Sequence, residues 1–462
     1  MKKDLILVVL TVLLGGVFVS AQTGSPAAPS PPPAARQAAP AFDVNAAVEA
    51  YLAKMPPERR AQSNAYFEGG YWLLLWDLLY SAIVMLLLLR MRWSAKMRDL
   101  AERLTRFRPL QTSIYWIQFI VVVSVLTFPL SLYEGYLREH KYGLLNQTFG
   151  PWMRDQLVSL GVVVVLGAIL IVPLFGLVRK LGKRWWVWGA VLMVVFSAFV
   201  ILVAPVYIFP LFNKYTPLKD ASIKDPILSM ARANGIPADD VYEFDASRQS
   251  NRVSANVSGF AGTQRISLND NLLKRCTLPE IETTMGHEMG HYVLNHAYKG
   301  LVMFGVVIVV GFAFLNWGIN YGLAHWGEQW GVRGITDVAV LPWAVIVFSL
   351  YILLVTPVTN SISRVMEYEA DLYGLNAAGQ PDGEANVDML FVDGRDQAEQ
   401  HAVDQELELL AQHPESPVRA EDVAFDVHTG HADARGVDLA VRAHVKDVIF
   451  EVRGGARLEQ PV

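Results

Sequence analysis

The sequence predicts a mainly α-helical, polytopic membrane protein with a smaller soluble portion that contains a few strands. Hydrophobic residues make up 53% of the 462 residues and charged residues only 18%, which is too apolar for an ordinary soluble domain. Six apolar segments each have the length needed to cross about 30 Å of hydrocarbon. They cover residues 70–90, 112–133, 156–178, 186–208, 300–320 and 338–358.

The N-terminal 21 residues have the layout of either a secretory signal peptide or a first membrane span. Lys2 and Lys3 precede an apolar run that ends in the small residues Ser20 and Ala21, which are typical of a cleavage site. Both interpretations stay open. Residues 22–69 are expected to be a linker, rich in proline and alanine in its first half, followed by a short pre-membrane segment.

The remaining chain divides around the apolar segments. A four-span membrane region is expected at 70–208 and a membrane hairpin at 300–358. Two soluble portions, 209–299 and 359–383, follow the fourth and the sixth span, and residues 384–462 form an acidic tail.

Basic residues predict which side of the membrane each loop faces. Loop 90–108 carries seven arginines and lysines and loop 179–184 carries four, whereas loop 134–155 is balanced. The positive-inside rule places the two basic loops in the cytoplasm. Residues 209–299 and everything after 358 are therefore expected on the outer side.

The soluble portion before the hairpin combines a strand pair with a helix. Residues 251–260 and 263–268 have strand-like composition and are joined by a glycine-containing turn. Thr277 and Glu280, with Pro279 between them, form a capping box that predicts the start of a helix.

This helix carries the motif His287-Glu288-x-x-His291. Residues four apart lie about one helical turn apart, so the two imidazoles can share one metal ion. Glu288 then lies beside the ion, where it can accept a proton from a metal-activated water. The less specific interpretation is that both histidines are ordinary surface residues. His296, nine residues after His287, is expected to support a ligand or to lie on the surface.

A zinc hydrolase needs a third protein ligand, and Glu367 is the candidate. Asp371 is one turn further on, where it can accept a hydrogen bond from a ligand imidazole. Glu369 is expected to face elsewhere. Because the hairpin returns the chain to the side that it left, His291 and Glu367 are expected on the same face of the membrane.

From about residue 70 to 380 the chain resembles the type I CAAX prenyl proteases, integral-membrane zinc endopeptidases of the gluzincin kind. The resemblance is carried by the two metal motifs together with residues 128–134, 139–143, 146–148, 210–218 and 247–273. It implies zinc held by His287, His291 and Glu367, with Glu288 as the general base and Asp371 behind the ligands, as a support for a ligand imidazole. It also implies seven helices around an intramembrane chamber, which requires the N-terminal segment as the seventh.

The resemblance further implies that the strand containing Ala255 and Asn256 binds the substrate backbone as an added strand. The alternative interpretation of Asn256 is an ordinary residue in a turn or at the edge of the sheet. The tail after Gly383 departs from the family, although His413 and Arg419 offer a histidine and arginine pair that could stabilise an oxyanion. A chance pairing is the alternative.

The expected function is a membrane zinc metalloendopeptidase that acts either on C-terminal prenylated peptides or in membrane-protein quality control. The alternative is a transport or scaffold protein with a structural zinc site. The single Cys276 excludes a cysteine-based metal site, and nothing indicates a nucleic-acid partner. Peptides and the lipid bilayer are the expected partners, and the bacterial inner membrane is the expected location, with the zinc site outside. The eukaryotic relatives are expected to carry the site in the cytosol.

Overall fold

A computed structural model describes residues 53, 55–258, 265–380, 383 and 386. The N-terminal signal or span, most of the linker, and the tail with His413 and Arg419 lie outside the described residues, so the predictions made for them stay predictions.

Each of the six predicted apolar segments corresponds to one long helix, and three of them extend into an adjoining π-helix or 3-10 turn. The helices are α3 (Pro57–Arg90), α5 (Arg108–Leu132), α7 (Phe149–Leu181), α8 (Trp185–Val203), α12 (His296–Trp330) and α13 (Leu341–Ala378). By length and composition, five continuous stretches can cross a membrane, because Phe149–Leu211 counts as one of them. A 3-10 turn, Gly182–Arg184, divides this stretch into α7 and α8, and Gly182 adopts a positive φ of 52° at the reversal.

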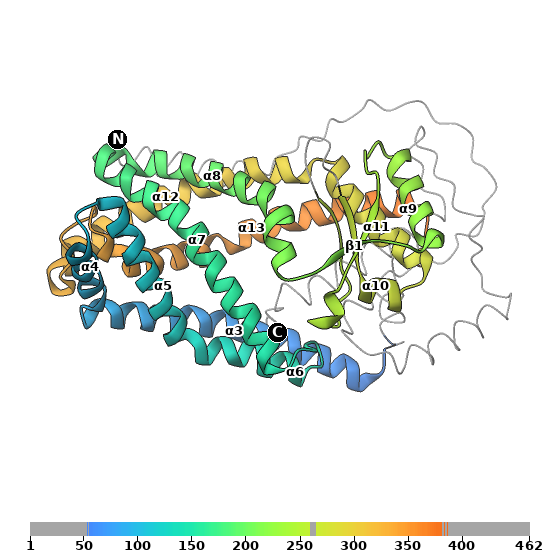
Figure 1. Cartoon of the computed structure of the whole chain (residues 1–462), viewed down its shortest axis with the longest axis horizontal. Coiled ribbons are helices and arrows are strands. Elements are labelled where there is room, and N and C mark those ends of the chain that lie inside the picture. The colour runs from blue at the N-terminus through green and yellow to red at the C-terminus, as the bar shows by residue number, and fades with distance from the viewer. Residues whose placement is uncertain (1–52, 54, 259–264, 381–382, 384–385, 387–462) are drawn as a thin grey trace, which may run out of the picture. The chain divides into compact units, whose positions relative to one another are not determined.

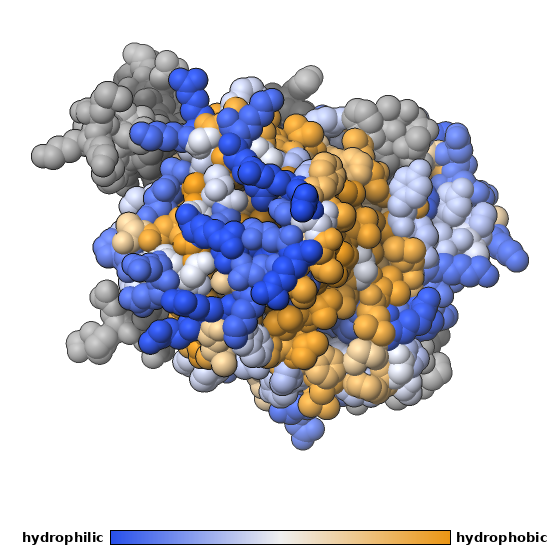
Figure 2. Space-filling model, turned by 60° about the vertical axis from the view of Figure 1, so that its left-hand side comes forward, coloured by the Kyte–Doolittle hydropathy of each residue, from blue (hydrophilic) through white to orange (hydrophobic). Residues whose placement is uncertain are grey.

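The outer surface of these helices is apolar, as expected of side chains that face lipid. Leu74, Val125 and Val302 are each about 70% exposed although they are large and hydrophobic. Figure 2 shows a broad apolar surface beside an end of the molecule on which hydrophilic side chains gather. The described residues therefore form a multi-pass membrane protein.

Shorter elements complete the fold. The helices are α4 (Trp93–Leu104), α6 (Glu139–Lys141), α9 (Ala221–Ala233), α10 (Asp270–Arg275) and α11 (Leu278–Val293). The π-helices are Tyr133–Arg138 and Ala204–Ile208, and the remaining 3-10 turns are Phe209–Leu211, Ala246–Arg248 and Val338–Val340. The strands are β1 (Tyr215–Pro217), β2 (Val241–Phe244), β3 (Ala255–Ser258) and β4 (Arg265–Asn269).

The four strands form one mixed sheet in the order β1-β2-β4-β3. Strands β2 and β4 are parallel, and the two outer pairs are antiparallel. The predicted strand pair is therefore confirmed as β3 and β4, and β3 lies at an edge of the sheet.

Helix α11 begins as the capping box predicts. The Thr277 backbone N–H donates to Glu280 Oε2 at 2.6 Å, and the Thr277 side chain accepts from the backbone of Glu280. Ile281, Met285 and Met289 recur every four residues and are fully buried in the core around the sheet. This stripe attaches one face of α11 to the sheet and leaves another face for the metal motif.

The loop between α5 and α7, together with the beginning of α7, binds the soluble portion through side-chain hydrogen bonds. Asn146 Nδ2 donates to Asn251 Oδ1 at 2.7 Å, and Gln249 Nε2 donates to Asp155 Oδ2 at 3.0 Å. Both contacts reach segment 246–252, which lies just before β3. The membrane region thus holds the sheet from the side of its edge strand.

The opposite end of the long axis carries α4 and the turn between α12 and α13 (Figure 1). Arg98 of α4 forms a hydrogen-bonded ion pair with Asp337, and their side chains are only 7% and 4% exposed. The Asp337 carboxylate also accepts from the backbone N–H groups of Arg333 and Ala339 at 2.9 and 3.0 Å. This pair joins the basic loop after α3 to the membrane hairpin.

We expect Asp337→Ala to lower the free energy of unfolding by about 3 to 5 kcal/mol, because it removes the only buried carboxylate that Arg98 has among the described residues and leaves it the exposed Asp99 alone. The matched control is Asp99→Ala, which removes a 43% exposed carboxylate from the same guanidinium and should cost at most about 1 kcal/mol. Unfolding of the two variants in detergent measures the difference. Equal losses would contradict the importance assigned to Asp337.

Candidate metal centre

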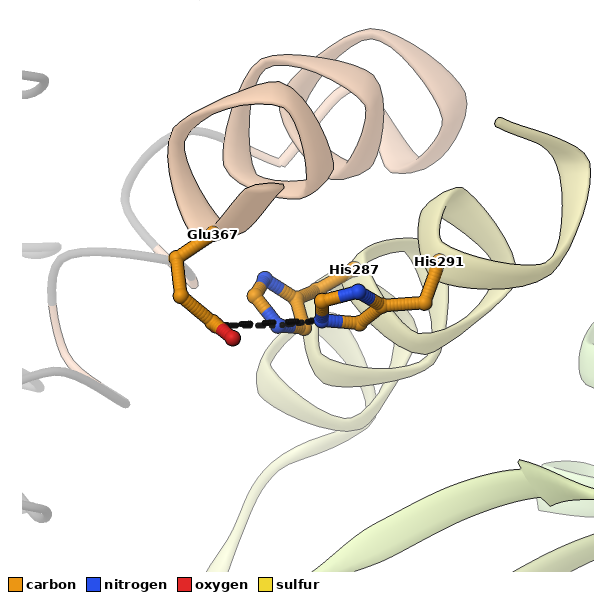
Figure 3. A group of neighbouring side chains, drawn as sticks. All are labelled: His287, His291 and Glu367. Carbon is orange, nitrogen blue, oxygen red and sulfur yellow. Dashed lines mark hydrogen bonds and ion pairs between the residues drawn. The ribbon is translucent and has the colours of Figure 1, made fainter. Parts of the chain in front are cut away.

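Three candidate ligands converge from two helices. Figure 3 shows His287 and His291 on α11 and the Glu367 carboxylate reaching them from α13. His287 Nε2 lies 3.0 Å from His291 Nε2 and 3.4 Å from Glu367 Oε2, and the distance from His291 Nε2 to Glu367 Oε2 is 3.7 Å. One ligand atom of each residue thus lies within 4.8 Å of the others.

These distances fit one tetrahedral metal ion. Nitrogen and oxygen ligands about 2.0 to 2.2 Å from such an ion lie roughly 3.4 Å from one another. Two imidazoles and one carboxylate are also a typical ligand set of zinc hydrolases, which keep the fourth position for water or substrate. The residues present therefore fit a zinc ion.

Asp371 is placed to orient His287. Its Oδ1 lies 2.7 Å from His287 Nδ1, so this nitrogen carries the proton and donates it to the carboxylate. The lone pair of Nε2 is then directed at the metal position. The structure brings Asp371 to the position in which the sequence predicts it.

His296 and Glu369 form a second link of the same kind. His296 Nδ1 lies 2.8 Å from His291 Nδ1, and His296 Nε2 lies 3.0 Å from Glu369 Oε2, which Lys299 Nζ approaches to 2.6 Å. One proton arrangement satisfies all of these groups: His291 donates to His296, and His296 donates to Glu369.

Glu369 contacts none of the three candidate ligands directly, but it holds His296, a contact that the sequence analysis did not predict. The count of nine residues from His287 to His296 assumed one straight helix, whereas Asn295 adopts a left-handed conformation with φ 58° and begins the new helix α12. His296 therefore turns back toward His291 and meets Glu369. A helical count of nine residues from His287 could not show this contact.

Glu288 lies beside the ligands on the half-buried side of α11. Desolvation by burial raises its pKa above the usual value, and this effect exceeds the lowering by the His287 and His291 imidazoles. A carboxyl group with a raised pKa is better suited to accept a proton and release it again near neutral pH.

Glycines allow α11 and α13 to approach with their backbones. A Cβ at Gly286 would lie 2.9 Å from the Gly374 carbonyl oxygen, and one at Gly290 would lie 3.1 Å from that of Ala370. A Cβ at Gly374 would lie 2.7 Å from the His287 backbone nitrogen. Our sequence reasoning missed these residues. The available signal was two glycines four apart inside a helix, where each costs about 1 kcal/mol relative to alanine.

Ala255 and Asn256 lie in β3, against which α11 packs. Within the described part of the chain, β3 pairs only with β4 and so has one free edge. The side-chain Oδ1 of Asn256 is buried and has no hydrogen-bond partner among the described residues. His413 and Arg419 lie outside the described residues, so their predicted role stays a prediction.

Two sequence families match this chain. One, described as the CAAX prenyl protease N-terminal region with five membrane helices, matches residues 44–214. The other, peptidase family M48, matches residues 217–424. The second match extends past Gly383, where we expected the resemblance to end, and its range includes the positions of His413 and Arg419.

Comparison with individual proteins also finds metalloproteases and CAAX prenyl proteases. The chain is 33% identical to an uncharacterized metalloprotease, YhfN, of Bacillus subtilis over 66% of this chain and 69% of that protein. It is 28% identical to the CAAX prenyl protease 1 homolog of Dictyostelium discoideum and to CAAX prenyl protease 1 of Saccharomyces cerevisiae, of which it covers 65% and 63%. The crystal structure of Ste24p of S. mikatae has the same fold, with a TM-score of 0.62 and 21% identity over 75% of this chain and 86% of that one.

We expect Gly374→Ala to weaken metal binding by about 10- to 100-fold, because the added methyl group pushes α13, and with it Glu367, away from α11. Metal titration of the purified metal-free chain measures this affinity. Gly161→Ala is the control, since a Cβ there meets nothing within 4 Å. Unchanged affinity in Gly374→Ala would show that the spacing of the two helices does not govern the site.

Proposed function

The chain belongs to peptidase family M48, the family of the type I CAAX prenyl proteases, and is a multi-pass membrane metalloprotease. We propose that it hydrolyses peptide bonds at the site between α11 and α13. The observation that carries this proposal is the convergence of His287, His291 and Glu367 on one position, with Glu288 beside it. A structural metal site has no need of that extra carboxylate.

The proposed resident metal is zinc, held by His287, His291 and Glu367. When bound, zinc supplies a Lewis acid that polarises the substrate carbonyl and makes a water more acidic. Glu288 takes the proton of the attacking water and passes it to the leaving amine. Asp371 and His296 keep the two imidazoles in the tautomer that ligation requires.

We propose that the substrate backbone pairs with the free edge of β3. This mode extends the peptide before cleavage and supplies backbone hydrogen bonds that do not depend on sequence. The unpartnered Oδ1 of Asn256 supports this role, since a substrate N–H could satisfy it. Ala255 begins the same strand, and His413 and Arg419 are proposed as donors to the oxyanion.

The proposed substrates are peptides or proteins presented at the membrane surface. C-terminal prenylated peptides come first, because several relatives are named CAAX prenyl proteases. Turnover of membrane proteins for quality control is the second candidate, and the orientation proposed below favours it.

We propose that the metal centre faces the outer side of a bacterial inner membrane. The basic loops 90–108 and 179–184 lie at the α4 end, whereas α11 lies at the other end of the long axis (Figure 1). If the basic loops are cytoplasmic, the metal site is outside. We also propose that residues 209–299 and 359–383 act together as the protease portion, while 70–208 and 300–358 anchor it.

Glu288→Gln should lower cleavage by about 100- to 10,000-fold while leaving the zinc content of the purified protein unchanged, because only the proton carrier is lost. Cleavage is measured with casein and with one peptide in prenylated and unprenylated form. Glu282→Gln, on the same helix, is the control and should remain active. Wild-type cleavage by Glu288→Gln would refute the peptidase mechanism, and a prenyl group without effect on kcat/KM would favour the quality-control substrates.

The orientation predicts the labelling of single cysteines introduced after Cys276→Ser. Asp239→Cys, exposed in the protease portion, should react with a membrane-impermeant maleimide in intact cells. Lys183→Cys, exposed in the α7–α8 turn, should react only after lysis. The reverse pattern would place the metal centre in the cytoplasm.

A further inference from the structure

A positively charged cavity, separate from the metal centre, lies where the membrane helices meet the sheet. Its volume is about 420 Å³, and four cationic side chains and one carboxylate line it. These residues, which define what we call the headgroup pocket, are Arg154, Lys214, Arg248, Arg265 and Asp245. Nothing in the proposed peptidase reaction uses them.

The pocket lies at the level expected for lipid headgroups. Arg154 is near the beginning of α7, and Pro210 and Leu211, which form a wall of the pocket, are the last residues of the continuous stretch Phe149–Leu211. Tyr207 and Phe209, which come just before that wall, are 70% and 40% exposed. Exposed aromatic residues at the end of a span are typical of the membrane–water interface.

The charges of the pocket are only partly balanced. Arg248 is near Asp245 at 3.8 Å and Asp155 at 3.9 Å, and Arg154 approaches Asp155 to 3.4 Å. In the part of the chain that the structure describes, Lys214 and Arg265 have no carboxylate partner. Two positive charges therefore remain in excess even when Asp155 is included.

Arg265 is held in place by groups that do not neutralise it. Its guanidinium carbon lies 4.2 Å from the centre of the Tyr215 ring, and its Nη2 donates to the Pro205 carbonyl oxygen at 3.2 Å. Its Nε is buried and, among the described residues, has no hydrogen-bond partner. A buried donor on a fixed, charged group is ready to bind an anion.

We propose that the headgroup pocket binds the phosphate of an anionic glycerophospholipid from the leaflet next to the metal centre. Guanidinium groups suit phosphate oxygens, because their donors form a planar fork. Basic pockets at the ends of membrane helices are a known type of site for anionic headgroups. The volume is within the range of about 300 to 1,000 Å³ that small-molecule sites occupy.

A lipid in this pocket would join the membrane to the sheet. Lys214 and Arg265 belong to the sheet region, with Arg265 opening β4, whereas Arg154 belongs to a membrane helix. One phosphate contacted from both sides would hold the protease portion against the bilayer. This inference rests on the membrane fold and not on the proposed peptidase function.

The test measures lipid affinity of the full-length chain purified in a neutral detergent. Short-chain phosphatidylglycerol is titrated, and the thermal unfolding midpoint and native mass spectra report binding. We expect Lys214→Gln and Arg154→Gln each to weaken binding about tenfold or more, because each removes a charged contact with phosphate. Both side chains are exposed, so the midpoint without lipid should stay at the wild-type value.

Lys183→Gln is the matched control, since it removes an exposed cation at the opposite end of the same pair of helices. It should bind phosphatidylglycerol like the wild type. Phosphatidylcholine should bind more weakly than phosphatidylglycerol, and added salt should weaken the binding of the anionic lipid.

Three results would overturn the proposal. The first is equal affinity of all variants for phosphatidylglycerol. The second is equal stabilisation by inorganic phosphate or glycerol phosphate at the same concentration, which would indicate a site for a free anion. The third is a response to a peptide with a free C-terminal carboxylate but not to lipid, which would assign the pocket to substrate.

Discussion

The backbone contact between α11 and α13 is the constraint on which the metal centre depends. Gly286 and Gly290 present no side chains to α13, and Gly374 presents none to α11, so the two helices lie closer than any larger residue allows. Because α13 is continuous from Leu341 to Ala378, the helix that crosses the membrane also positions Glu367. The third ligand is thus placed by the membrane fold.

The other face of α11 is fixed by the sheet, and the sheet by the membrane loops. Met285 and Met289 are fully buried against the sheet, each two residues from a candidate ligand. Arg252, just before β3, donates to Glu139 Oε2 at 2.7 Å and to the Tyr66 hydroxyl at 2.9 Å. Hence α3, the α5–α7 loop, the edge strand and the HExxH helix form one connected support.

The two ends of the molecule use charge in different ways. At the α4 end, Arg98 is buried with Asp337 and serves packing, while the exposed cations of the loops are the basis of the proposed orientation in the membrane. At the metal end, the proposed headgroup pocket keeps Lys214 and Arg265 unbalanced beside the bilayer. Among the described residues, Arg98 has a buried carboxylate partner, whereas Lys214 and Arg265 have no carboxylate partner and are proposed to bind an external anion.

The sequence by itself determined what depends on local periodicity and composition. Apolar length predicted the membrane helices, the capping box predicted where α11 begins, and four-residue spacing placed His287 beside His291. The tertiary structure alone decided which distant residues meet. The glycine contact joins Gly286 and Gly374, which are more than eighty residues apart in the sequence. The His296–Glu369 hydrogen bond depends on the left-handed Asn295, which ends one helix and begins another where the sequence analysis assumed a single helix. Contacts of this kind arise from packing between elements, which no local pattern encodes.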